Sequence, residues 1–216
     1  MLKGLLRGLK RDEPAPVPGR AGEDATALLA QALAAYRRGD KLESARRGRE
    51  ALERDPASAP AWSLLGRIAS EERDTARAIE CYAEVLALRP DDPDYLVDAA
   101  EIHRRAGQLG RALDLSARAL ELRAEDRRAW QVRGAALEAL GRLDEAVRCL
   151  QQELRLAPQD ADAHSNLLHL LNRSGLWEAE AVAAEHRAWG ARHADALTPA
   201  RPSCPARRWI SAASTR

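Results

Sequence analysis

The chain contains five histidines that could ligate a metal ion or transfer protons. His164 and His169 are five positions apart, so on a helix their side chains point to different sides. His186 and His193 are separated by about two helical turns, roughly 10 Å. Because neither spacing lets two imidazoles share a metal ion, the sequence predicts no metal site.

The other residues that could carry chemistry have structural explanations. His103 and His164 fall at positions that we expect to pack against the core. Acidic pairs such as Glu71-Glu72 fall at expected turns, where capping and solvation account for them. The sequence has no glycine-rich phosphate loop, Cys-x-x-Cys pair or nucleophile motif. We therefore predict that the chain is not an enzyme, with no catalytic residue and no cofactor.

The elements that position these residues come from an internal repeat with a period of about 34 residues. Four copies are aligned on the prolines that end them, and a fifth, looser copy follows. The copies are residues 25–58, 59–92, 93–126, 127–160 and 161–194. A repeat of this length is typical of stacked helical hairpins, so the sequence predicts an all-α protein.

Each copy has the pattern of two amphipathic helices. In the second copy, Trp62 and Gly66 fall on the first helix, Ala78 and Tyr82 on the second, and Pro90 ends the repeat. Small residues let the two helices approach closely, and apolar residues recur three and four apart. These residues resemble the tetratricopeptide repeat over about residues 25–194. The resemblance implies a solenoid of about five helix-turn-helix repeats, closed by a capping helix from Trp177 to about His193.

The two ends of the chain differ from the repeats in charge. The net charge is +1, but residues 1–11 and 192–216 are basic, which leaves the repeats acidic. An acidic body argues against nucleic acid as the partner, because such binding requires phosphate neutralisation. We expect residues 1–24 to form a basic, leucine-dotted terminus and a proline-rich linker. Residues 195–216 are expected to form a disordered tail rich in Pro and Arg.

The cysteines and the lengths of the apolar runs indicate where in the cell the protein is located. The three cysteines suggest no disulfide framework, and Cys81 and Cys149 occupy equivalent repeat positions too far apart to pair. They indicate a reducing compartment, so we predict a cytoplasmic protein. No apolar run approaches the roughly 18 residues that span a bilayer. Residues 1–11 do place leucines beside basic residues, so peripheral membrane contact stays open as an alternative.

The first helix of each repeat carries polar residues that packing does not explain, and these residues are candidates for binding a partner. In tetratricopeptide arrays this inner surface commonly holds an extended peptide, and we expect the same of this chain. The predicted partner is thus a protein or peptide. The predicted groove residues are Arg67, Glu101, Arg104, Arg105, Arg128, Gln131, Asn166, His169, Asn172 and Arg173. Chaperone-binding members clamp a terminal carboxylate with Lys and Asn, but the corresponding positions here hold Asp98 and Val132, which disfavours that mode.

The last copy carries a second resemblance. The run HSNLLHLLN at residues 164–172 and the run EHRAWG at 185–190 resemble the junction in bacterial proteins similar to O-linked N-acetylglucosamine transferases and SPINDLY-type proteins. In that family the junction leads into a glycosyltransferase domain, which this chain does not contain. The resemblance implies the substrate-recognition part of such a protein. The alternative is an independent scaffolding adaptor.

Overall fold

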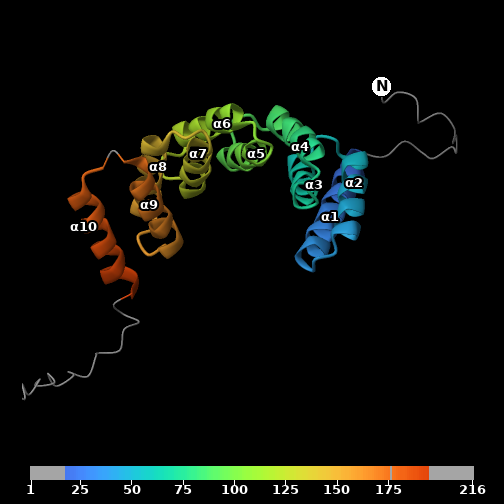
Figure 1. Ribbon diagram of the computed structural model, residues 1–216. Coiled ribbons are helices and arrows are strands. Elements are labelled where there is room, and N and C mark those ends of the chain that lie inside the picture. The colour runs from blue at the N-terminus through green and yellow to red at the C-terminus, as the bar shows by residue number, and fades with distance from the viewer. Residues whose placement is uncertain (1–17, 176, 195–216) are drawn as a thin grey trace, which may run out of the picture. The chain divides into compact units, whose positions relative to one another are not determined.

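The computed structural model describes residues 18–175 and 177–194, and these residues are entirely helical apart from the short turns between helices (Figure 1). The predicted all-α class, built from repeated helical hairpins, is confirmed. The described residues divide into two compact units, one that ends at Val132 (unit 1) and one that begins at Arg133 (unit 2). No helix among the described residues is long and apolar enough to cross a membrane.

Unit 1 contains three helical hairpins and the beginning of a seventh helix. The hairpins are α1 (Pro18–Arg37) with α2 (Lys41–Arg54), α3 (Ala59–Glu71) with α4 (Thr75–Leu88), and α5 (Pro93–Arg105) with α6 (Leu109–Leu122). Consecutive hairpins pack through α2 against α3 and through α4 against α5. Helix α7 (Arg127–Ala139) crosses the boundary, so its residues 127–132 belong to unit 1.

The turns inside the hairpins need a residue with positive φ. Gly39 and Gly107 supply it in the first and third hairpins, where a glycine carries no steric penalty. In the second hairpin the same place is taken by Arg73, with φ of 64°. The Asp74 side chain then accepts a hydrogen bond from the backbone N–H of Arg77 at 3.1 Å and caps α4. Helix capping at this turn therefore persists without the glycine.

Small residues bring the helices of unit 1 close together. Tyr82 of α4 is only 1% exposed and packs in one cluster with Val85, Leu96 and Val97. Gly66 of α3 lies directly against it, and a Cβ atom there would come within 2.8 Å of the Tyr82 ring. The glycine is thus required by the close approach of α3 to α4.

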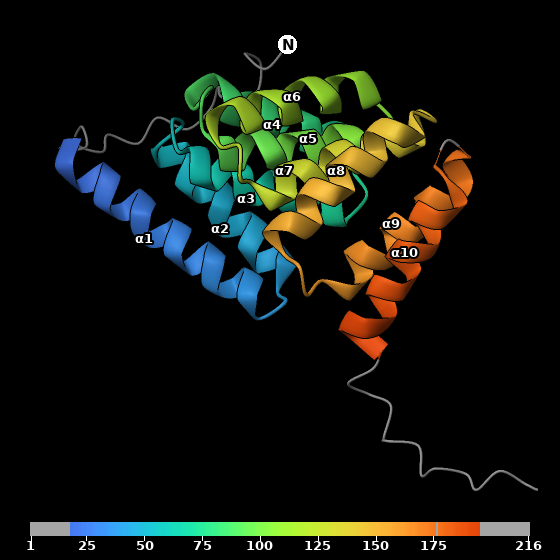
Figure 2. The same cartoon turned by 90° about the vertical axis from the view of Figure 1, so that its left-hand side faces the viewer.

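Unit 2 contains the rest of α7, then α8 (Leu143–Leu156), α9 (Ala161–Ser174) and α10 (Ala179–Trp189), followed by a π-helical turn η1 (Gly190–Ala194). Helix α8 packs on α9, and α9 lies beside α10 (Figures 1 and 2). The expected terminal helix is present as α10, but it begins at Ala179 rather than at Trp177. None of the residues of α10 is fully buried.

Three further expectations differ from the structure or lie outside it. Helix α1 begins at Pro18, inside the segment expected to be a linker, because a proline at the first helical position loses no hydrogen bond. His103 is only half-buried, and its Nδ1 lies 2.6 Å from Oε1 of Gln108 in the following turn, so it does not pack in the core. The basic residues 1–11 and the tail 195–216 lie outside the described residues.

The two described cysteines are buried, as predicted. Burial raises the pKa of the Cys81 thiol above its usual value and that of Cys149 to about 11. A thiol that stays protonated is a poor nucleophile and a poor metal ligand. Both side chains therefore serve packing.

Candidate functional site

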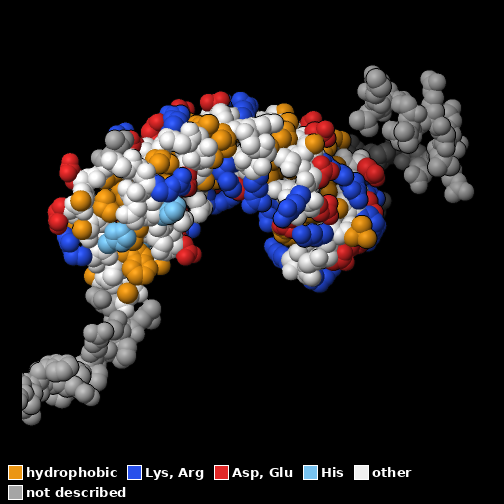
Figure 3. All heavy atoms as spheres, viewed as in Figure 1, with side chains coloured by type: hydrophobic (Ala, Val, Ile, Leu, Met, Phe, Trp, Pro, Cys, Tyr) orange, Lys and Arg blue, Asp and Glu red, His pale blue; other side chains and the backbone are white. Residues whose placement is uncertain are grey.

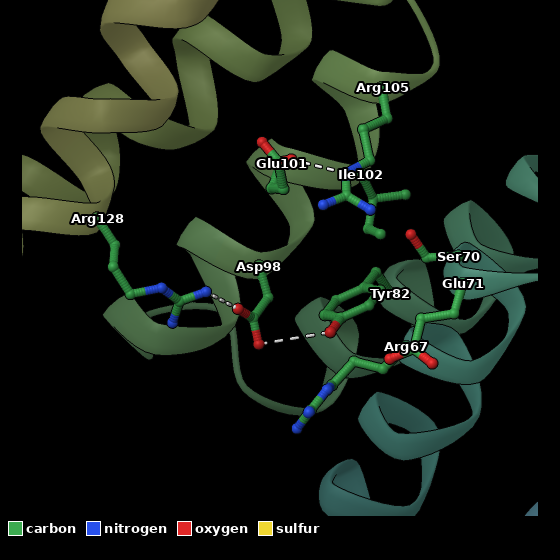
Figure 4. A pocket seen from close by; sticks show the side chains of 9 residues that line it. All are labelled: Arg67, Ser70, Glu71, Tyr82, Asp98, Glu101, Ile102, Arg105 and Arg128. Carbon is green, nitrogen blue, oxygen red and sulfur yellow. Dashed lines mark hydrogen bonds and ion pairs between the residues drawn. The ribbon is translucent and has the colours of Figure 1, made fainter. Parts of the chain in front are cut away.

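A hollow of about 410 Å³ opens between the helices of unit 1 (Figure 4). Helices α3, α4 and α5 and the first turn of α7 supply its walls. The lining residues are Arg67, Ser70, Glu71, Tyr82, Asp98, Glu101, Ile102, Arg105 and Arg128. Three are arginines and three are carboxylates, so the wall is charged but balanced. Figure 3 shows the same mixture of basic and acidic side chains on the surface of unit 1 over α1 and α3.

Asp98 binds two neighbours across the hollow. Its Oδ1 accepts a hydrogen bond from the guanidinium of Arg128, which also forms an ion pair with it. Its Oδ2 lies 3.4 Å from the hydroxyl of Tyr82, which donates to it. Burial and the nearby carboxylate of Asp98 raise the pKa of Tyr82 well above its usual value, so the hydroxyl stays protonated. Asp98 thereby connects α4, α5 and α7.

Glu101 forms a second charged cluster on α5. It accepts hydrogen bonds from Arg104 at 2.7 and 2.8 Å and from Arg105 at 2.6 Å. Burial alone would raise the pKa of Glu101, but the hydrogen bonds from the two guanidinium groups outweigh it and the pKa lies below the usual value. Both arginines are thus already paired with a carboxylate.

Arg67 is held differently. Its Cζ lies 4.8 Å from the centre of the Tyr36 ring, and its Nη2 donates to the Tyr36 hydroxyl at 3.2 Å. Tyr36 in turn donates to Glu71, whose other oxygen forms an ion pair with Lys41 at 2.6 Å. Among the described residues no carboxylate lies within ion-pair distance of Arg67. The guanidinium of Arg67 is therefore held over the Tyr36 ring and close enough to Glu71 to help lower its pKa, but it forms no direct ion pair within the described residues.

The structure brings four of the predicted groove residues to this hollow: Arg67, Glu101, Arg105 and Arg128. Arg104 lies beside it, bonded to Glu101, and Gln131 is exposed on α7 without lining the hollow. The sequence pattern indicates only a packing role for Tyr82, and Asp98 stands in it only as a residue that disfavours a chaperone-type clamp. Tyr36 was missed because it lies in the preceding hairpin, about 30 residues from Arg67.

The remaining predicted residues lie in unit 2. Asn166 and His169 are exposed on α9. The Asn172 amide nitrogen lies 3.3 Å from Nε2 of His186, and Arg173 forms an ion pair with Glu138 at 2.7 Å. These four residues belong to a separate compact unit and form no part of the hollow.

A buried polar cluster joins α9 to the C-terminal helices of unit 2. The side chain of His164 is fully buried, with Nε2 2.9 Å from Oε1 of Glu185 and Nδ1 3.1 Å from Nε2 of His193. Beside it, Nε1 of Trp189 donates to Oγ of Ser165 at 3.1 Å. The expected burial of His164 is correct, but its partners are polar. No group of three or more potential metal ligands occurs within the described residues.

We predict that acid weakens unit 2 through His164. Burial lowers the pKa of His164 below its usual 6.5, and His193 and Arg192 act in the same direction, against the raising effect of Glu185. Between the folded pKa and 6.5 the unfolded chain binds more protons, so stability is lost as the pH falls below about 6.5. The melting temperature, followed by circular dichroism from pH 7.5 to pH 5, should show this loss.

Two variants isolate the contribution of His164. His164→Asn removes the titrating group and should flatten the pH dependence, whereas His169→Gln removes an exposed histidine of the same helix and should leave it intact. An unchanged pH dependence in His164→Asn would contradict the prediction.

Comparison with protein families gives two matches. The tetratricopeptide repeat profile matches residues 29–93 and 132–196, together more than half of the chain. A profile described as anaphase-promoting complex, cyclosome, subunit 3 matches residues 71–153.

One curated protein is similar to this chain in sequence, and solved structures share its fold. Small glutamine-rich tetratricopeptide repeat-containing protein 2 of Mycosarcoma maydis is 29% identical over 108 residues, which are 50% of this chain and 31% of that protein. This chain therefore matches about a third of that relative's length. MamA 41-end from Desulfovibrio magneticus RS-1 superposes with a TM-score of 0.71 at 20% identity, covering 78% of this chain and 94% of the other. YrrB, a TPR protein with an unusual peptide-binding site, gives 0.66 at 21% identity, covering 85% and 96%.

Proposed function

Because the chain belongs to the tetratricopeptide repeat family, we propose that it is a non-catalytic interaction module that holds an extended peptide of a partner protein in the hollow of unit 1. Members of this family are typically interaction modules, and the peptide-binding site of YrrB occurs on the same fold. The hollow of about 410 Å³ carries the proposal, because its lining of fixed donors and acceptors suits a peptide.

The chemistry of the lining fits a peptide backbone. Asp98 and Glu101 offer carboxylate oxygens to peptide N–H groups, and the guanidinium groups offer donors to peptide carbonyls. Most of these side chains are already held by ion pairs in the free protein. Holding them in advance reduces the conformational entropy lost on binding.

A bulky substitution inside the hollow tests the proposal. Ser70 is a small, half-buried residue of the lining, and Ser70→Trp would fill the space that a peptide needs (Figure 4). The full-length chain is immobilised and exposed to a pool of random peptides of about ten residues, and the bound peptides are quantified by mass spectrometry. Capture should fall by more than about tenfold, since a steric clash that costs over ~1.4 kcal/mol has this effect.

Ala83→Trp is the matched control, since Ala83 is an exposed residue of α4 that does not line the hollow. This variant should capture peptides as the unmodified chain does. If Ser70→Trp captures as much as Ala83→Trp, while both retain the melting temperature of the parent, the hollow is not the peptide site.

We further propose a more specific function, that the chain recognises substrates for a protein glycosyltransferase. This proposal is supported only by the sequence resemblance of residues 164–190. None of the relatives named above is described as a glycosyltransferase. His164 and Trp189 also have a structural role, since both fasten the C-terminal helices to α9. Co-purification of the chain with a sugar-nucleotide-binding protein would support this assignment, and its loss on Ser70→Trp would link it to the hollow.

Two further expectations stay proposals. A scaffolding adaptor that contacts membranes through residues 1–11 is the alternative function, tested by deleting that segment and measuring sedimentation with anionic lipid vesicles. A cytoplasmic location is supported by the buried free thiols of Cys81 and Cys149, which fit a reducing compartment.

A further inference from the structure

We propose that the hollow selects peptides carrying a carboxylate, and that Arg67 is the residue that receives it. The proposal rests on the proposed function and adds the chemical class of the ligand. It follows from the pairing of charges in unit 1 rather than from the number of arginines.

The three arginines of the hollow differ in how far they are neutralised. Arg105 is bonded to Glu101 at 2.6 Å, and Arg128 forms its ion pair with Asp98. An incoming carboxylate at either place would have to compete with a carboxylate that is already bound. Within the described part of the chain, the guanidinium of Arg67 has only the neutral hydroxyl of Tyr36 as an acceptor. Lys41 and Arg67 share one carboxylate, that of Glu71, so this cluster keeps one positive charge for a ligand. Arg67 is the member of the cluster that lines the hollow and forms no direct ion pair.

The setting of Arg67 holds its guanidinium in place. The group lies over the Tyr36 ring, and the Tyr36 hydroxyl is fixed by Glu71, which Lys41 binds at 2.6 Å. One N–H of Nη2 is used on Tyr36, which leaves the remaining N–H groups for a ligand. A guanidinium with free N–H groups and restricted motion binds a carboxylate by two parallel hydrogen bonds.

The rest of the wall restricts where a negative charge can lie. Asp98 and Glu101 line the same hollow and would repel a carboxylate placed away from Arg67, whereas Glu71 lies near Arg67 and is itself paired with Lys41. The same oxygens accept hydrogen bonds from peptide N–H groups. A phosphate carries nearly twice the charge of a carboxylate and would need a second free cation, since the other two lining arginines are paired. The wall thus favours an extended peptide with one carboxylate at the Arg67 end.

The carboxylate can come from a chain end or from an Asp or Glu side chain, and peptide chemistry separates the two. The probe is a pool of random peptides of about ten residues without acidic residues, prepared as the C-terminal acid and as the C-terminal amide. A second pair of pools, both amidated, contains one internal Glu or one internal Gln. At least one acidic pool should bind the full-length chain roughly tenfold better than its neutral partner, as expected for a charge-assisted hydrogen bond of about 1.5 kcal/mol or more.

Substitutions then assign the preference to Arg67. In Arg67→Gln the acidic and neutral pools should bind equally. Arg118→Gln is the matched control, because Arg118 pairs with Asp91 outside the hollow and its loss removes the same charge from unit 1. Its preference for acidic peptides should persist. Arg67→Glu should reverse the preference and favour pools with one internal Lys, a change that general weakening of the fold cannot produce.

The outcomes that overturn this inference differ from those that overturn the proposed function. Equal binding of acidic and neutral pools by the unmodified chain, with capture still blocked by Ser70→Trp, removes the carboxylate preference and leaves the peptide site. Equal loss of preference in Arg67→Gln and Arg118→Gln shows that total charge, not Arg67, selects the ligand. Stronger capture of a pool with one phosphoserine than of the Glu pool contradicts the choice of a carboxylate.

Discussion

Replacing Tyr82 with alanine is expected to lower the free energy of unfolding of unit 1 by about 3–5 kcal/mol, as large-to-small changes of buried aromatic residues do. The side chain is 1% exposed and packs in one cluster with residues of α3, α4 and α5. Its removal leaves a cavity where these three helices meet. Urea unfolding followed by circular dichroism should show the loss as a lower transition midpoint.

Tyr82→Phe separates packing from the hydroxyl group. The ring stays, and the hydroxyl loses its long hydrogen bond of 3.4 Å to Asp98 and its interaction with Ser63, so we expect a cost of about 1 kcal/mol. If Tyr82→Ala cost no more than Tyr82→Phe, the ring would not be the packing centre that the structure describes.

The second large effect is expected at Gly66. Changing a glycine to alanine inside a helix ordinarily stabilises it by about 0.5–1 kcal/mol. At Gly66 the added Cβ would lie 2.8 Å from Cδ2 and Cε2 of Tyr82 and 3.1 Å from Cβ of Cys81. Because Tyr82 is enclosed and cannot move aside, we expect Gly66→Ala to destabilise unit 1 by about 1–3 kcal/mol through overpacking. Thermal unfolding of the variant measures this loss.

Gly110→Ala is the control for Gly66→Ala. Gly110 lies in the first turn of α6, and an added methyl group there would meet no atom within 4 Å, so Gly110→Ala should not destabilise unit 1. The two large changes should also be coupled. In a Tyr82→Ala background the methyl group at position 66 has room, so the combined cost should be smaller than the sum of the two single costs. If the cost of the double variant equalled the sum of the two single costs, the clash with Tyr82 would not be the cause of the destabilisation by Gly66→Ala.

The sequence could predict those residues of the candidate site whose place follows from their position within a repeat. Arg67, Glu101, Arg105 and Arg128 were placed on one surface because they occupy related positions of successive first helices, and the structure brings them to one hollow. Asp98 could have been found in the same way, since it precedes Glu101 by one turn on α5. Its pairing with Arg128 has no signature in the sequence.

Other contacts could not be predicted because they depend on side-chain rotamers across helices. Tyr36 and Arg67 come from different hairpins, and their stacking distance of 4.8 Å depends on how α1 packs near α3. Spacing within one helix compares His164 with His169 and His193 with His186, whereas the contact in the structure joins His164 to His193, 29 positions away. Local spacing excludes a shared site on one helix, but it says nothing about two helices that fold together.

The sequence by itself determined the helical hairpins, because helix periodicity, turn glycines and terminal prolines act within a few residues of one another. It also indicated the close packing of paired helices, since the positions of Gly66 and Ala78 hold a small residue in each of the first four copies. Only the tertiary structure decided which charges are neutralised. An ion pair requires two atoms within about 4 Å, and that distance depends on the packing of separate helices. For this reason only the structure shows that Arg67, unlike Arg105 and Arg128, lines the hollow without a direct ion pair to a described carboxylate.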